Sequence, residues 1–464
     1  MTNVCAIKRY SIILGPVLGF GLSWWLHGTN AGLSSEACLA AGFTLWTVVW
    51  WVFEPIPIPV TSLLPLALFP LFGVIDKTEV AKAYGDWLII LLMGGFILSK
   101  SIEKSGVHRR IALMMVNAFG HKSDRMLVFS FMLVSALLSM WISNTATTLM
   151  LLPIVLAVVQ HIKNKELSLA LLLGIAYAAN IGGVGTPIGT PPNLIFINQY
   201  KAFTGETIDF LQWMKWGVPL VIVFVPIMTI WLTRNLNGRS DTKIPEPGKW
   251  RQSEIRILIV FALTALAWVS RDMGGFGWKH QLGLEGANDA SVALLAVILC
   301  FIIPDGEGQG ERLLDWKHAS QIPWGLLLLF AGGLAIGSAF KLTGLSSALG
   351  EQFGYLTRLP TFLLIICICL VVTFLTEVTS NTATTAILMP ILGAIATSAD
   401  MNHLHLMLPA VMSASCAFML PVATAPNAVV YGSEQLNIDS MIRNGLVINL
   451  IGAVLISLLC YFMT

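Results

Sequence analysis

The hexapeptide SNTATT occurs twice in this chain, at Ser143–Thr148 and at Ser380–Thr385, and the two copies are 237 residues apart. Both copies interrupt long apolar stretches, and in each case the apolar run that follows reaches a proline, Pro153 or Pro390. In lipid, hydroxyl and carboxamide groups are costly unless they face protein, water or a ligand. Two such clusters at matching positions therefore predict a shared polar site built by an internal repeat, as expected for transport of a small polar or charged solute.

The composition predicts an all-α polytopic membrane protein. Hydrophobic residues make up 56% of the 464 residues and charged residues only 11%, and apolar segments of spanning length recur along the chain. The net charge of +2 gives no sign of a nucleic-acid partner, and the expected surroundings are a lipid bilayer. Eleven transmembrane helices are expected, near residues 11–27, 36–53, 59–75, 87–100, 169–197, 211–233, 255–271, 290–304, 322–340, 405–432 and 441–463.

The distribution of basic residues predicts the orientation. Most Lys and Arg residues fall in segments that share one side of the membrane if the amino terminus is cytoplasmic. The positive-inside rule then places the carboxyl terminus outside, in a plasma membrane and, in a bacterium, the inner membrane. Residues 1–34 are expected to hold a retained first helix, because no clean cleavage site for a signal peptide follows it.

The stretches 126–160 and 361–398 are each too long for one span and too short for two. Because SNTATT divides each of them, the sequence predicts two re-entrant helical hairpins whose polar tips lie near mid-bilayer. Under the charge-based orientation the hairpins enter from opposite faces, so residues 35–234 and 257–464 are expected to be inverted repeats. Residues 235–256 are polar and charged, which predicts a cytoplasmic linker between the repeats.

Two further segments place proline and small polar residues inside otherwise good helices. Residues 189–193 (GTPPN) in the first half pair with residues 423–427 (ATAPN) in the second half. Proline lacks a backbone donor and interrupts a helix, which frees carbonyl oxygens in the preceding turn. Each half is therefore expected to combine a hairpin tip with a broken helix.

These elements suit an anion and a small cation. Helix amino termini carry partial positive charge and free N–H groups, and no Lys or Arg lies in either hairpin core or either break, so a cation transported with the anion would balance its charge. Ser and Asn at a tip are also ordinary helix N-caps, but two matching copies favour a site. Hydroxyls four residues apart on a helix share one face, and with the freed carbonyls they form an oxygen cage suited to sodium, with lithium or proton coupling left open. The two cages are Ser139, Ser143, Asn144 and the Gly189 carbonyl, and Thr376, Ser380, Asn381 and the Ala423 carbonyl.

Glu377 lies beside the second tip, inside an apolar stretch. A carboxylate there is either a proton or cation site or a group that accepts amide hydrogens of the hairpin or reaches water. The second interpretation is favoured.

On these motifs, the sequence resembles the divalent anion/sodium symporter family, the INDY-type sodium-coupled dicarboxylate transporters. The paired SNT tips and residues 414–430 (ASCAFMLPVATAPNAVV) carry the resemblance, which extends over nearly the whole chain. It implies 11 transmembrane helices plus two hairpins, a homodimer, and an elevator mechanism in which a transport domain slides against a scaffold. It also implies sodium at the two cages and a substrate held by Asn144, Thr145, Thr190, Asn381, Thr382 and Thr424.

The expected function is import of C4 dicarboxylates such as succinate, malate or fumarate, coupled to sodium. The alternatives left open are a sulfate or citrate carrier and a sodium-independent dicarboxylate exchanger of the same fold. An anion channel would need a continuous polar stripe along several helices, and an enzyme would need a nucleophile–base pair or a metal cluster within a span. The sequence offers neither, and it has no nucleotide-binding loop.

Overall fold

The structure is a computed structural model that describes residues 2–29, 32–120, 123–159, 164–236, 238, 246–271, 276–308, 310–345, 348 and 360–463. Within these ranges every regular element is a helix, apart from one isolated β-bridge between Pro304 and Arg312. The expected all-α class is therefore confirmed.

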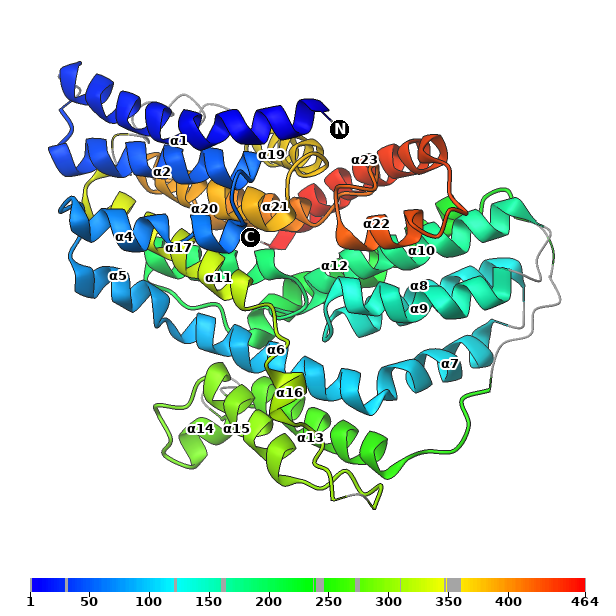
Figure 1. Ribbon diagram of the computed structural model, residues 1–464. Helices are drawn as coiled ribbons and strands as arrows, with labels where there is room; N and C mark the ends of the chain where they lie inside the picture. The colour runs from blue at the N-terminus through cyan, green and yellow to red at the C-terminus, as the bar shows by residue number, and fades with distance from the viewer. Residues whose placement is uncertain are drawn as a thin grey trace.

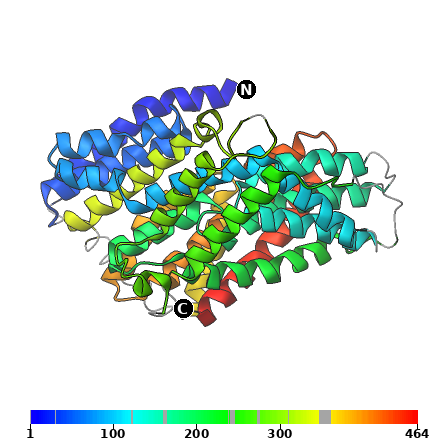
Figure 2. The same ribbon diagram turned by 90° about the horizontal axis from the view of Figure 1, so that it is seen from below.

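One group of helices forms the outer part of the bundle. In Figures 1 and 2, α1–α5 lie to the left, whereas α7–α10 lie to the right. In Figure 1, α13–α15 lie below α6, and both α13 and α15 pack on α6. The outer group contains α1 (Thr2–Gly28), α2 (Ser35–Phe53), α3 (Ile58–Thr61), α4 (Leu64–Leu71), α5 (Lys77–Tyr84), α6 (Trp87–Ser105), α13 (Gln252–Val269), α14 (Trp278–Gln281), α15 (Asp289–Ile302), α16 (Trp316–Ala319) and α17 (Trp324–Leu342).

The second group contains both hairpins and both broken helices. Each hairpin packs on the broken helix of its own half, and its returning helix also packs on the last helix of the other half's broken pair: α9 on α22, and α20 on α11. The two halves are therefore interlocked. This group contains α8 (Asp124–Ser139), α9 (Asn144–Val159), α10 (Lys165–Gly182), η1 (Gly183–Gly185), α11 (Pro191–Thr204), α12 (Phe210–Leu232), α19 (Thr361–Thr376), α20 (Asn381–Ser398), α21 (His403–Ala414), α22 (Ala425–Tyr431) and α23 (Ile438–Met463).

The hairpin helices are short for membrane spans. Helices α8, α9 and α19 have 16 residues each, which at 1.5 Å per residue is about 24 Å, less than the ~30 Å of bilayer hydrocarbon. Four residues separate the two helices of each hairpin, at 140–143 and at 377–380. The helix–loop–helix units thus lie where the sequence places the hairpins, and their re-entrant insertion stays a prediction.

Glycine marks the point where the chain leaves the outer group. Helix α6 ends at Gly106, which has φ +72°, and α7 (Val107–Phe119) then leads to the first hairpin. After α17, Gly344 has φ +75° in the matching position of the second half. This left-handed conformation costs glycine little, so a turn can form at each of these two points.

Two predicted boundaries differ from the structure. The span expected at 59–75 consists of two short helices, α3 and α4, because the prolines at 65 and 70 restrict the backbone of this stretch. Helix α13 begins at Gln252, inside the predicted linker, because the Glu254 carboxylate accepts the Arg251 N–H at 2.8 Å and caps the helix. Seven helical stretches among the described residues are long and apolar enough to cross a membrane, so the count of eleven stays a prediction.

Candidate functional site

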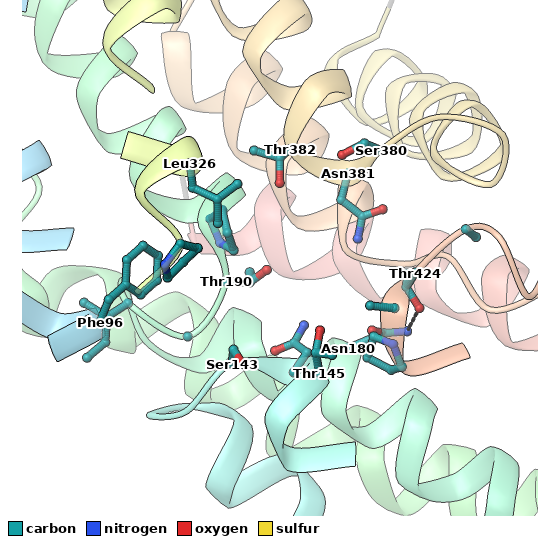
Figure 3. A pocket seen from close by; sticks show the side chains of 18 of the residues that line it. Phe96, Ser143, Thr145, Asn180, Thr190, Leu326, Ser380, Asn381, Thr382 and Thr424 are labelled. Atoms are coloured by element: carbon teal, nitrogen blue, oxygen red, sulfur yellow. Dashed lines mark hydrogen bonds between the residues drawn. The ribbon is translucent and has the colours of Figure 1, made fainter. Parts of the chain in front are cut away.

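Both hairpin tips and both broken helices face one cavity of about 660 Å³. In Figure 3, the side chains of the first tip lie opposite those of the second tip, with Thr190 and Thr424 between them. The cavity brings together ten of the residues expected to form the site: Ser143, Asn144, Thr145, Gly189, Thr190, Ser380, Asn381, Thr382, Ala423 and Thr424. The remaining two, Ser139 and Thr376, are fully buried behind the tips.

The first tip gathers three oxygen atoms, one of them a hydroxyl that contacts the other two. The Ser139 hydroxyl lies 2.6 Å from Asn144 Oδ1 and 2.7 Å from the Ala179 carbonyl oxygen. A hydroxyl has a single hydrogen, so the two acceptors must share it. Clustered neutral oxygens of this kind are the ligands that hard cations prefer.

The second tip repeats this arrangement. The Thr376 hydroxyl lies 2.6 Å from Asn381 Oδ1 and 3.0 Å from the Ala414 carbonyl oxygen. Because both Asn Oδ1 atoms are acceptors here, the Nδ2 amide of each Asn is the end available to a ligand in the cavity. Each tip therefore combines an oxygen cluster behind the Asn with an amide donor in front of it.

The serines at the two tips differ in their local bonding. Ser143 Oγ accepts the backbone N–H of Ala146 at 3.2 Å, which is the N-cap bond of α9. Ser380 is the N-cap residue of α20, yet its side chain makes no capping bond. Capping therefore accounts for one of these two hydroxyls and not for the other.

The loop of the first broken helix passes close to Asn144. A Cβ atom added at Gly183 would lie 2.6 Å from Asn144 Oδ1, and one at Gly189 would lie 2.5 Å from the Gly183 carbonyl oxygen. Glycine at both positions lets the backbone approach the tip and fold back on itself. The Gly189 region therefore lies beside the first oxygen cluster.

Two asparagines that sequence reasoning left out of the site hold these loops. Asn193 Nδ2 donates to the carbonyls seven and ten residues before it, those of Thr186 at 2.8 Å and Gly183 at 2.9 Å. Asn427 makes the same two bonds, to the carbonyls seven and ten residues before it, at 3.0 and 2.9 Å. The sequence does carry a signal for these two asparagines, because Asn is the last residue of both paired segments, GTPPN and ATAPN.

Asn180 joins the two halves at the centre of the site and was also missed. Its Nδ2 group donates to Thr424 Oγ1 at 3.0 Å, shown dashed in Figure 3, and lies 3.3 Å from Asn427 Oδ1. Asn180 is the one carboxamide between Lys165 and Pro192, in a mostly apolar run. Its own Oδ1 is buried without a protein partner, so this oxygen retains bonding capacity beside the cavity.

Glu377 is 3% exposed and is fully engaged in structural bonds. Its Oε1 accepts the backbone N–H groups of Phe418 at 2.7 Å and Met419 at 2.8 Å, and its Oε2 accepts that of Leu420 at 3.0 Å. Asn449 Nδ2, from α23, donates to the same Oε1 at 2.7 Å. The carboxylate therefore has the structural role favoured from the sequence, but the amides that it accepts belong to the loop of the second broken helix and not to the hairpin.

Charged groups line the cavity only away from the tips. Among the described residues that line it, the charged ones are Glu54, Lys100 and Glu103, at the ends of α2 and α6. The tips present uncharged hydroxyl and amide groups together with the ends of helices. Such a surface can bind an anion by hydrogen bonds without a permanent counter-charge.

This combination of paired hairpins and one shared polar cavity defines a class, the polytopic membrane transporters. Comparison with known proteins makes the assignment specific. The citrate transporter family matches residues 48–402. The sodium-dependent dicarboxylate transporter SdcS of Staphylococcus saprophyticus is 39% identical over 97% of this chain and 90% of that protein. SdcS of Staphylococcus aureus strain NCTC 8325 is 37% identical over the same shares.

Two solved transporters share the fold. The YdaH transporter of Alcanivorax borkumensis superposes with a TM-score of 0.61 at 15% identity, over 92% of this chain and 98% of that one. MtrF of Neisseria gonorrhoeae superposes with a TM-score of 0.59 at 15% identity, over 89% of this chain and 96% of that one. The chain belongs to the citrate transporter family, and the resemblance to the divalent anion/sodium symporters is confirmed. Membership of a transporter family also confirms the expectation that the chain is not an enzyme.

Proposed function

We propose that this protein imports C4 dicarboxylates such as succinate, malate or fumarate, coupled to sodium. The observation that carries the proposal is the pair of equivalent donor sets on opposite sides of one cavity: Asn144 and Thr145 from one repeat, Asn381 and Thr382 from the other. Two donor sets suit a molecule with two carboxylates, one at each end. A compact anion such as sulfate has a single centre and would leave one set without a ligand.

Sodium is the proposed coupling ion. The two three-oxygen clusters lie directly behind the substrate-facing amides, and the same Asn side chain belongs to both the cluster and the donor set. An ion bound at Asn144 Oδ1 or Asn381 Oδ1 would fix the amide and direct its Nδ2 hydrogens toward the anion. The positive charge would also compensate the dianion, which otherwise meets no cation at the tips. The names of the SdcS relatives, sodium-dependent dicarboxylate transporters, support this assignment.

Transport is proposed to follow an elevator mechanism. The second helix group would move as the transport domain, and the turns at Gly106 and Gly344 would let the chain change direction where it leaves the outer group. Residues 35–234 and 257–464 are proposed as the two inverted repeats, in a homodimer in the plasma membrane. A citrate or sulfate carrier or a sodium-independent exchanger of the same fold remains the alternative.

Uptake by proteoliposomes tests the proposal. Labelled succinate, citrate and sulfate are each offered with an inward sodium gradient, an inward potassium gradient or no gradient. We expect concentrative succinate uptake with sodium alone. If uptake of citrate or sulfate exceeds that of succinate, the proposed substrate is wrong. If succinate uptake is equal under all three conditions, the proposed sodium coupling is wrong.

The orientation can be tested separately. In a variant without the seven native cysteines, Lys8→Cys and Asp400→Cys should react with a membrane-impermeant thiol reagent from opposite faces, because both positions are exposed and lie at opposite predicted sides. Reaction of both cysteines from one face would overturn the inverted-repeat topology.

A further inference from the structure

The described residues that line the cavity lead from the tips to one face of the protein. Its far end is lined by the carboxyl ends of α2 and α6 and by the beginning of α17, where Glu54 and Gln321 are exposed. At the other end of α17, Lys341 donates to the Ala202 carbonyl at 2.6 Å, and neither residue lines the cavity. The charge-based orientation makes the open face cytoplasmic. The route between the site and the cytoplasm therefore passes Glu54 and the end of α6.

One cation lies on this route. Among the described residues that line the cavity, Lys100 is the sole Lys or Arg, and its Nζ lies 2.6 Å from Glu103 Oε2. The two side chains are 24% and 26% exposed, so the pair is accessible from the cavity. The other carboxylate of the mouth, Glu54, lies 3.8 Å from Lys8 Nζ, which itself does not line the cavity.

We propose that the Lys100 ammonium binds a dianionic substrate transiently as the substrate enters or leaves the cavity at its cytoplasmic mouth. This inference rests on the proposed function. Without Lys100, a dianion passing the end of α6 would meet the like charge of Glu103, whose side chain is only 26% exposed, and charge repulsion is strong where groups are partly desolvated. With Lys100 present, the ammonium can exchange the Glu103 carboxylate for a carboxylate of the substrate. Partly exposed ion pairs three residues apart on a helix are weak, about 1 kcal/mol or less. Exchanging the Glu103 carboxylate for a substrate carboxylate therefore costs little free energy.

The next lysine on the same helix offers a matched contrast. Lys104 Nζ lies 2.8 Å from Asp315 and 3.4 Å from Glu311, and it also donates to the Arg312 carbonyl. The hydrogen bond from Lys104 holds the pKa of the Asp315 carboxyl well below its usual range, so the pair stays ionised. Lys104 does not line the cavity. Lys100→Gln and Lys104→Gln therefore remove the same charge from the same end of α6, but only the first removes it from the route.

The test compares the two faces of the membrane. Labelled succinate uptake at saturating sodium is measured in right-side-out and in inverted membrane vesicles, at low ionic strength and with added inert salt. Lys100→Gln should raise the half-saturating succinate concentration roughly three- to tenfold in inverted vesicles and leave it unchanged in right-side-out vesicles. The difference should shrink as salt screens the charge, because the Debye length falls below about 10 Å above 0.1 M.

The control variants make the outcome decisive. Lys104→Gln should leave both half-saturating concentrations near those of the unmodified protein, and Glu103→Gln should lower the value in inverted vesicles. An equal effect of Lys100→Gln and Lys104→Gln, an equal change at both faces, or a rise with Glu103→Gln would each overturn the role of Lys100. If the unmodified protein takes up no succinate in either vesicle, the proposed function fails instead, which distinguishes the two failures.

Discussion

The loops of the two broken helices carry out the same task with different chemistry. Residues 183–190 read GVGTPIGT and residues 417–424 read AFMLPVAT, so the first loop has three glycines where the second has none. In the first loop the Met140 side chain lies against Gly185, where an added Cβ would be 2.6 Å from its methyl carbon. At the equivalent position, 237 residues later, Glu377 instead accepts the amide hydrogens of three loop residues.

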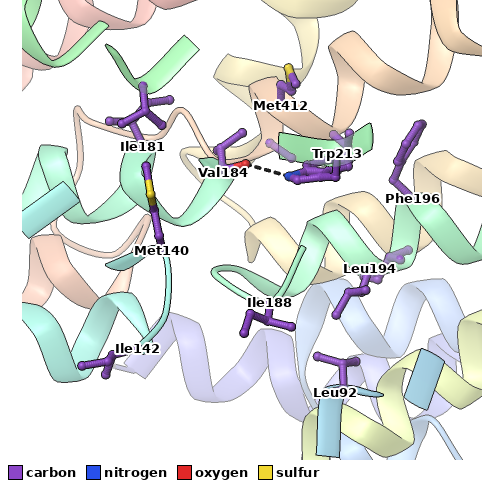
Figure 4. Packing of buried hydrophobic residues seen from close by; sticks show 14 of the residues in the cluster. Leu92, Met140, Ile142, Ile181, Val184, Ile188, Leu194, Phe196, Trp213 and Met412 are labelled. Carbon is purple, nitrogen blue, oxygen red and sulfur yellow. Dashed lines mark hydrogen bonds between the residues drawn. The ribbon is translucent and has the colours of Figure 1, made fainter. Parts of the chain in front are cut away.

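The difference shows how one geometry can be reached from two sequences. Glycines let the first loop approach apolar neighbours closely, and Val184 contributes its carbonyl to a bond from Trp213 Nε1 at 2.8 Å, drawn in Figure 4. The second loop has bulky residues whose N–H groups are buried, and an unpaired buried N–H is costly. The carboxylate of Glu377 satisfies these groups. We infer that the second loop depends on one charged side chain, whereas the first depends on close packing and on hydrogen bonds from uncharged groups.

The largest expected effect tests whether the two tips are equivalent. Asn144→Ala and Asn381→Ala each remove a proposed substrate donor together with an oxygen of the proposed cation cluster. Either change should lower sodium-driven succinate uptake by roughly a hundredfold, the equivalent of about 2.7 kcal/mol. Initial uptake rates in proteoliposomes give the measurement. Asn117→Ala, on α7 and away from the cavity, is the control and should retain most activity. Near-normal uptake by one of the two tip variants would show that only one tip binds the substrate.

A smaller effect separates the two loops. Glu377→Gln removes the charge that three backbone amides and Asn449 share. Bonds to a charged acceptor are stronger than neutral ones, and the new amide hydrogens would face donors, so we expect a loss of roughly 2 kcal/mol in stability. Met140→Leu, at the equivalent position of the first loop, conserves volume and should cost less than about 1.5 kcal/mol.

Thermal unfolding in detergent measures both variants, with and without sodium. The midpoint of Glu377→Gln should fall by several degrees, and that of Met140→Leu should change little. Equal midpoints for the two variants would contradict the inferred difference between the loops. A normal midpoint for Glu377→Gln combined with lost uptake would instead assign Glu377 a direct role in transport.

Much of this arrangement could be predicted from the sequence, because the internal repeat is visible as identical sequence segments. The identical SNTATT segments, placed between two apolar arms, predict the hairpins and their tips. Helix α7 escaped detection because it is amphipathic and carries Arg109 and Arg110, so a search for apolar runs does not find it. The bond from Asn180 to Thr424 could not be predicted, because it depends on how the two halves dock, which no local pattern encodes.

The smallest expected effect concerns the oxygen clusters behind the tips. Ser139 and Thr376 are buried and do not line the cavity, so they reach the substrate only through the Asn side chain in front of them. Ser139→Ala or Thr376→Ala should raise the sodium concentration for half-maximal uptake roughly tenfold, which corresponds to about 1.4 kcal/mol for one lost oxygen ligand. At saturating sodium the substrate affinity should recover, because a bound ion affects a linked site only while its own site is partly empty.

Thr145→Ala is the contrasting variant, because Thr145 lines the cavity and is assigned to the substrate. Its loss of uptake should persist at every sodium concentration. Uptake is measured as a function of sodium at fixed succinate and as a function of succinate at saturating sodium. If Ser139→Ala and Thr376→Ala lower uptake equally at low and saturating sodium, the two hydroxyls only hold the Asn side chains and the helices together, and sodium binds elsewhere. If only one of them responds to sodium, the repeats share a fold but not a coupling site, and the symmetry of the tips is structural alone.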